Sequence, residues 1–207
     1  MTKLSLKALA LIITAPLLAC VLLMADPALS EERVLKGPAT GSLYHKDSFK
    51  WTEEPIRVVA VYDKTFLDDL TYIIGGKDDY ETGSALFELG QPGQANTENR
   101  YEREKFISLL KKSQGWLITA SKEQVKETRY LSRVFRGFNV DMVPGTDGRD
   151  NTLRIKIKDY TRDRRLVLHL NAFQVGQLVK LLEQAPAAFD AMAKAQGHRR
   201  LGGGYHK

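Results

Sequence analysis

The stretch TLRIKIKDYTRDRRLVLHLNAFQVGQLVKLLEQ, residues 152–184, decides the fold that the sequence predicts. Apolar and basic side chains alternate over residues 153–158, and leucines recur at every second position over residues 166–170. Such alternation is typical of β-strands with one buried face. An antiparallel hairpin that pairs 155 with 168 and 157 with 166 places these leucines and isoleucines on one side. The opposite side of the hairpin is then basic.

The hairpin leads directly into a predicted helix. Asn171 and Gln174 form a capping-box pattern at its start, and apolar residues follow at helical spacing. Pro186 interrupts this helix, because proline removes a backbone donor and clashes with the preceding turn.

Strands and helices alternate in the sequence upstream of the hairpin. Apolar runs or alternation predict strands over residues 57–62, 116–120 and 138–142. Helical spacing and capping patterns predict helices over residues 65–75, 98–113 and 121–137. We therefore expect an α+β (mixed α/β) fold, in which about four helices cover a small mixed sheet with a C-terminal antiparallel hairpin.

The chain divides into four expected segments. Residues 1–30 form an apolar export segment, and residues 31–55, which lack periodicity, form an extended tether. Residues 56–196 form a single globular domain. Residues 197–207 form a flexible basic tail that is rich in glycine.

The first segment has the pattern of an export signal. Lys3 and Lys7 precede an uncharged run over residues 8–25. Cleavage as a signal peptide is the favoured outcome, retention as a membrane anchor is a second, and lipidation of Cys20 in the lipobox-like sequence LLAC is a third. The positive end stays on the cytoplasmic side in each case, which predicts a body in the periplasm or on the outer face of the plasma membrane.

Composition bounds the functions that remain. The chain has 207 residues, of which 43% are hydrophobic and 27% charged, so disordered and collagen-like classes are excluded. A single cysteine excludes intrachain disulfides and cysteine-based zinc or iron–sulfur sites. The sequence has no HExxH, nucleophile elbow, phosphate loop or dinucleotide glycine motif, so we expect no cofactor and no metal. A non-catalytic role is favoured. The alternative is an unrecognised envelope enzyme that uses His169 beside loop 77–97.

Charge is divided unevenly between the two halves of the chain. Residues 31–97 hold 7 basic and 12 acidic side chains, net −5, whereas residues 98–207 hold 22 basic and 12 acidic, net +10. The basic half predicts an anionic partner, either lipid head groups or an acidic protein surface. The alternative is that the acidic half folds back onto the basic half.

Two predicted elements concentrate the basic residues. At 100° per residue, cations of the 121–137 helix fall on one stripe, and the hairpin adds cations on its polar face. Alternatively, the cations of the helix are simply solvated and bind no partner, and those of the hairpin protect a sheet edge from aggregation. The candidate binding residues are Lys122, Lys126, Arg129, Arg133, Arg136, Arg154, Lys156, Lys158 and Arg165.

The segments TLRIKIKDY and RRLVLHLNAFQVGQLVKLLEQ, in strand–strand–helix order, resemble the PC4-like single-stranded-DNA-binding coactivator family over about a fifth of the chain. The resemblance implies single-stranded nucleic-acid binding as a second hypothesis. Such binding also favours aromatic side chains between the cations, and Tyr160 at the hairpin turn is the one that the sequence places well.

Overall fold

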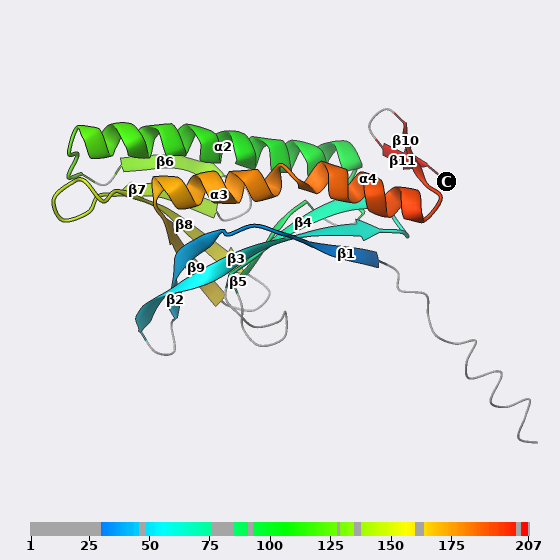
Figure 1. Ribbon diagram of the computed structural model, residues 1–207, viewed down its shortest axis with the longest axis horizontal. Coiled ribbons are helices and arrows are strands. Elements are labelled where there is room, and N and C mark those ends of the chain that lie inside the picture. The colour runs from blue at the N-terminus through cyan, green and yellow to red at the C-terminus, as the bar shows by residue number, and fades with distance from the viewer. Residues whose placement is uncertain are drawn as a thin grey trace, which may run out of the picture.

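The computed structural model describes residues 30–45, 49–75, 85–90, 93–127, 129–134, 138–159, 164–201 and 204–206. Figure 1 shows a curled sheet with helices along one side. The strands are β1 (Ser30–Leu35), β2 (Thr40–His45), β3 (Lys50–Asp63), β4 (Asp68–Gly75), β5 (Ala85–Leu89), β6 (Arg129–Val134), β7 (Phe138–Val143), β8 (Thr152–Asp159), β9 (Arg164–Leu170), β10 (Arg199–Leu201) and β11 (Gly204–His206). The helices are α2 (Asn96–Lys122), α3 (Ala172–Leu182) and α4 (Ala185–Ala195).

One large sheet dominates the described residues. Its strand order is β5-β4-β3-β2-β9-β8-β7-β6, and β1 pairs with the part of β3 that extends past β2. Every printed pairing in it is antiparallel. Strands β2–β5 and β6–β9 thus form two meanders of four strands, each followed along the chain by a helix.

The contact between β2 and β9 joins the two meanders. Ser42 faces His169 and Leu43 faces Leu168 in this register. Gly41 precedes these pairs, and a Cβ there would lie 2.6 Å from a methyl carbon of Leu170. Glycine at this position therefore allows β2 to pack closely against the apolar side chains of the neighbouring strand.

The expected fold class is wrong. The sheet is large and antiparallel rather than small and mixed, and the described residues carry three helices rather than about four. Two of the predicted helices are not helices, and residues 116–120, predicted as a strand, continue helix α2. The helix predicted over residues 98–113 does exist, but it extends at both ends.

The helix predicted over residues 65–75 is a turn followed by strand β4. All but one of the residues of β4 are buried, so apolar side chains occur on both of its faces. Leu70, Ile73 and Ile74 consequently fall at helical spacing although the backbone is extended. Periodicity alone does not separate a strand buried on both faces from a helix.

The helix predicted over residues 121–137 is absent because α2 ends at Lys122. Gln124 has a positive φ of 52°, which no helix can accommodate. Val125 N–H donates to the Ala120 carbonyl and Gln124 N–H donates to the Ser121 carbonyl, the hydrogen-bond pattern of a Schellman C-cap. The chain then leaves the helix, and residues 129–134 form strand β6.

The two terminal segments of the body are also more ordered than we expected. Residues 31–55 were expected to form a tether, but they supply most of β1, β2 and the first part of β3. The tail expected from residue 197 contains the hairpin β10–β11, and Tyr205 in this hairpin is buried. Charged and aromatic contacts hold this hairpin against the body, as described below.

Several local predictions are confirmed. The β8–β9 hairpin pairs Ile155 with Leu168, as predicted from the alternation. Residues 138–143 form strand β7. Asn171 and Gln174 form the predicted capping box at the start of α3.

The main core lies between the sheet and the helix layer. Buried residues of α2 recur at alternating spacings of three and four along one narrow stripe, which faces the rest of the molecule: Asn99, Arg103, Phe106, Leu110, Ser113, Leu117 and Ala120. Alternate residues of β3, such as Val58 and Ala60, face the same core.

No helix among the described residues is long and apolar enough to cross a membrane.

Candidate binding face

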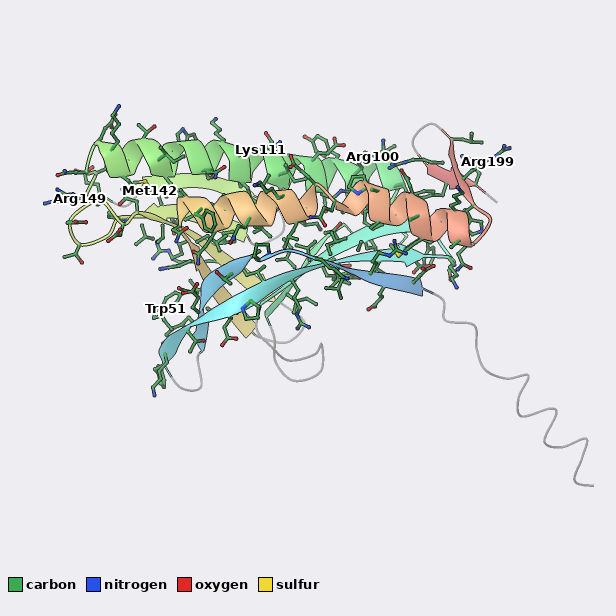
Figure 2. All side chains as sticks on the ribbon, in the orientation of Figure 1. Trp51, Arg100, Lys111, Met142, Arg149 and Arg199 are labelled. Atoms are coloured by element: carbon green, nitrogen blue, oxygen red, sulfur yellow. The ribbon has the colours of Figure 1, made fainter. Side chains whose placement is uncertain are left out.

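The outer face of the sheet is the side opposite the helices. Because side chains alternate along a strand, burial of Leu43 and Leu168 in the core places Tyr44 and His169 on the outer face. Trp51 is the register partner of Tyr44 and shares this face. Figure 2 shows Trp51 at the end of the sheet away from the helices, whereas Arg100 and Lys111 lie on the helix layer.

Three rings form a continuous row across β3, β2 and β9. The ring centroids of Tyr44 and Trp51 are 5.3 Å apart, and those of Trp51 and His169 are 4.3 Å apart. Both pairs are tilted, in the distance range of favourable aromatic contacts. Trp51, the middle ring of the row, is 46% exposed, so the row is partly open to solvent.

Two basic residues continue the row on the next strand. Arg154 of β8 is the register partner of His169, and Lys156 is two residues further along the same face. Their side chains are 26% and 45% exposed. We call the set Tyr44, Trp51, His169, Arg154 and Lys156 the aromatic–basic row.

Asp141 of β7 limits the positive charge of this row. Its Oδ2 atom lies 2.6 Å from Nη2 of Arg154 and 3.7 Å from Nζ of Lys156. Nε of Arg154 also donates to the same oxygen at 3.0 Å. The carboxylate therefore fixes the guanidinium firmly, while Lys156 keeps a longer contact and more exposure.

His169 is held in its neutral form. Burial, with the positive charges of Arg154 and Lys156 as smaller contributions, lowers the pKa of His169 to about 4. Its Nε2 atom is shielded from solvent and has no hydrogen-bond partner among the described residues. At neutral pH this residue thus acts in the row as an uncharged ring.

The tip of the β2–β3 hairpin lies next to the row. Phe49 is 78% exposed and has a positive φ of 53°, and Lys50 after it is also exposed. The pair His45–Lys50 is the last in the β2–β3 register. Large apolar groups are therefore presented to solvent where the hairpin turns.

The structure brings together some of the predicted binding residues. Arg154 and Lys156 lie side by side, as the alternation predicted. Lys158 and Arg165 are backbone register partners further along the same hairpin, but their side chains lie outside the described structure, as does all of Arg136.

The predicted helical stripe does not exist as one surface. Lys122 is the last residue of α2 and Lys126 lies in the connection that follows; both are exposed. Arg129 and Arg133 belong to β6, at the edge of the sheet two strands away from β8. Their side chains are outside the described structure, and so is Cys20. A binding role for these residues stays a prediction.

Sequence reasoning missed Tyr44, Trp51 and Asp141 as members of the face. Tyr44 and Trp51 were assigned to a tether, although residues 40–45 and 50–54 flank a short polar turn signal. Asp141 gave no signal of its own, because its contact with Arg154 depends on the register between β7 and β8.

A second polar cluster lies under the C-terminal hairpin, away from the row. Asp69 of β4 and Arg103 of α2 are almost completely buried, with Nη2 of Arg103 3.3 Å from Oδ2 of Asp69. Arg200 of β10 approaches the same oxygen at 3.7 Å. Burial raises the pKa of Asp69, and the two arginines oppose this effect.

Aromatic contacts complete the attachment of this hairpin. The Tyr205 hydroxyl lies 3.1 Å from Oδ1 of Asp190, and the Tyr62 hydroxyl lies 2.7 Å from Nδ1 of His198. The rings of Tyr62 and Tyr205 meet edge to face with centroids 5.1 Å apart. Burial raises the pKa of Tyr62 to about 12, with smaller contributions from nearby carboxylates.

An open depression of about 650 Å³ lies beside the hairpin. Its lining includes Phe66, Asp68, Asn96, Leu201 and Tyr205. His169 does not line it. Within the described part of the chain, no group of three or more His, Cys, Asp or Glu side chains is placed to hold a metal ion.

No protein-family model matches the chain, and no curated protein matches it. Among solved structures, the chain is similar to SsgB of Streptomyces coelicolor, mutations in which correlate with longitudinal cell division during sporulation. The identity is 11% and the TM-score 0.30, over 77% of this chain and 87% of that one.

A second similar structure is an SsgA-like sporulation-specific cell division protein from Thermobifida fusca. The identity is 9% and the TM-score 0.32, over 84% of this chain and 98% of that one. TM-scores this low establish no shared fold, so the function is argued below from the outer face alone.

Proposed function

We propose that this chain is a non-catalytic accessory protein that docks an anionic partner on the outer face of its sheet, through the aromatic–basic row. The observation that supports the proposal is the placement of Arg154 and Lys156 directly beside a row of aromatic rings in which Trp51 is exposed and Tyr44 and His169 are half-buried. The cations suit a partner that presents negative groups on an extended surface, and aromatic side chains beside them suit the interface of a membrane. The export segment predicted in residues 1–30 supports a site of action on the outer side of the plasma membrane.

The affinity expected from this surface is modest. Each near-surface cation contributes about 1 kcal/mol toward an anionic lipid surface. Asp141 already pairs with Arg154, so the residual attraction comes chiefly from Lys156 and from cations outside the described side chains. Binding should therefore weaken markedly as salt rises, because partly exposed charges are screened within a Debye length of about 10 Å at 0.1 M ionic strength.

Vesicle sedimentation of the full chain tests the proposal. The quantity to measure is the ratio of affinity for phosphatidylglycerol-containing vesicles to affinity for purely phosphatidylcholine vesicles, because the apolar N-terminus contributes to both. The double variant Arg154→Gln/Lys156→Gln should reduce this ratio by about tenfold at low salt. The matched control is Lys180→Gln/Lys194→Gln, which removes two exposed lysines from the helix layer. Equal ratios for the two double variants would contradict the proposal.

Single-stranded nucleic acid is a second candidate partner, because of the row of Tyr44, Trp51 and His169. Bases stack on aromatic rings, and a neighbouring arginine or lysine contacts the phosphates. This candidate predicts an oligothymidine affinity that falls steeply with salt, and a loss of about tenfold or more in Trp51→Ala. Absence of oligothymidine binding at low salt would remove it.

A further inference from the structure

The tip of the β2–β3 hairpin has a feature that charge-based docking does not explain. Phe49 is the most exposed of the large apolar side chains that the structure describes, and it stands beside Lys50 and the partly exposed Trp51. We call Phe49, Lys50 and Trp51 the aromatic tip. A single exposed phenylalanine is ordinary on a protein surface, but Phe49 adjoins a second exposed aromatic side chain, Trp51 at 46%, and the two together offer an apolar contact to a partner.

The backbone at Phe49 strengthens this point. A φ of 53° is rare for a bulky residue, and glycine or asparagine would adopt it at lower cost. Strained positions cluster at functional sites, so a phenylalanine at this position supports the hypothesis that its side chain contacts a partner.

The chemistry of the aromatic tip matches a lipid bilayer. Tryptophan and tyrosine favour the interface between head groups and hydrocarbon, and a lysine among them can extend its amine to the head groups. Trp51 and Tyr44 are register partners on β3 and β2, with ring centroids 5.3 Å apart, and Phe49 lies closest to the turn in the sequence. Figure 1 shows this end of β2 and β3 extending away from the helix layer, so a flat surface can reach the tip.

Nucleic acid fits the same end less well. Trp51 is already packed between Tyr44 and His169, and the row offers one loosely paired cation, Lys156, among the described side chains. A phosphate backbone requires several cations for appreciable affinity.

We infer that the partner on the outer face is a lipid bilayer with anionic head groups, and that the aromatic tip inserts Phe49 and Trp51 into its interface. This inference rests on the proposed function and names the partner of the same site. Insertion supplies an apolar contribution that salt does not screen, and Arg154 and Lys156 select the anionic surface. The matching control residue is Phe66, which is 56% exposed in the turn between β3 and β4.

The experiment uses the two tryptophans of the chain as reporters. Trp116→Phe leaves Trp51 as the single tryptophan, and Trp51→Phe leaves Trp116, which lies on helix α2. Each full-length protein is mixed with phosphatidylglycerol–phosphatidylcholine vesicles that carry brominated acyl chains, and the quenching of tryptophan fluorescence is measured. We expect strong quenching and a blue shift for Trp51, and little change for Trp116.

Two further variants test the role of Phe49. In the Trp116→Phe protein, Phe49→Ser should weaken Trp51 quenching and vesicle affinity by about tenfold, whereas Phe66→Ser should leave both unchanged. Circular dichroism verifies that each variant is folded. Equal effects of the two serine variants would overturn the inference.

The outcomes separate this inference from the proposed function. If the protein binds anionic vesicles in a manner that depends on Arg154 and Lys156 but Trp51 is not quenched, the inference fails and the proposed function stands. If oligothymidine binds and vesicles do not, the partner is nucleic acid and the inference again fails. If neither probe binds at low salt, both fail.

Discussion

The buried ion pair between Asp69 and Arg103 gives the most quantitative prediction for the fold. The exposed fractions of the two side chains are 0% and 1%, and Nη1 of Arg103 has no hydrogen-bond partner among the described residues. Asp69→Asn keeps the volume but removes the charge that compensates Arg103. The ring of Phe189, with its centroid 4.9 Å from the guanidinium carbon, then provides only a weak cation–π contact.

Removing one partner of a buried pair costs about 3 to 5 kcal/mol, because the other charge is left without compensation. In a chain of this size each kcal/mol shifts Tm by about 2 to 4 °C, so we expect a loss of roughly 6 to 20 °C. Arg200, which is 24% exposed, also contacts Asp69. Its contact with Asp190 remains in Asp69→Asn, and this moderates the loss of stability.

Urea denaturation monitored by circular dichroism measures the effect, with an unchanged m-value as evidence that only stability has changed. The control is Asp147→Asn, which removes the exposed pair with Arg149 at 3.8 Å and should cost under about 1 kcal/mol. Asp69→Asn/Arg103→Met should recover much of the loss. If Asp69→Asn lowers the free energy of unfolding by no more than Asp147→Asn does, the buried pair does not stabilise the contact between β4 and α2.

Three further predictions concern the row and the α3 cap. Trp51→Ala should raise the pKa of His169 from about 4 toward its ordinary value, because the ring no longer shields it; an unchanged NMR titration would contradict this. At His169 the unfolded chain binds more protons than the folded one between about pH 4 and 6.5, so this residue lowers stability as pH drops through the window. Urea midpoints should therefore fall less steeply in His169→Gln, and parallel midpoint curves would be evidence against it. Asn171→Ala should cost about 1 kcal/mol in urea denaturation by removing the bond to the Gln174 amide, and a neutral effect would show that the cap is dispensable.

The parts of the fold that the sequence predicts correctly are those with local and one-sided patterns. The β8–β9 register follows from strict alternation, because its strands bury one face and expose the other. The capping box depends on two residues three positions apart, Asn171 and Gln174, and needs no tertiary information.

The errors arise where tertiary burial overrides the local pattern. Strand β4 is buried on both faces, so its apolar residues imitate helical spacing. The helix predicted after Ser121 rested on a capping-box pattern, but the same residues form the C-terminal cap of α2. A capping pattern in the sequence does not by itself indicate whether the helix precedes or follows it.

The candidate site was predictable in part. Arg154 and Lys156 follow from the hairpin alternation. The aromatic rings beside them come from β2 and β3, more than 100 positions earlier in the chain, and reach Arg154 only through the pairing of β2 with β9. That long-range pairing left no local signal, so residues 31–55 were interpreted as a tether.

Under the proposed function the outer face of the sheet, and not the helix layer, contacts the partner. Amide hydrogen exchange of the full chain with and without phosphatidylglycerol-containing vesicles tests it most directly, since protection maps the contact along the backbone. We expect slower exchange at the β2–β3 turn, at the start of β3 and in β8, with α2 and α3 unchanged. Protection confined to α2 and α3, with the β2–β3 turn exchanging as fast as in free protein, would contradict it.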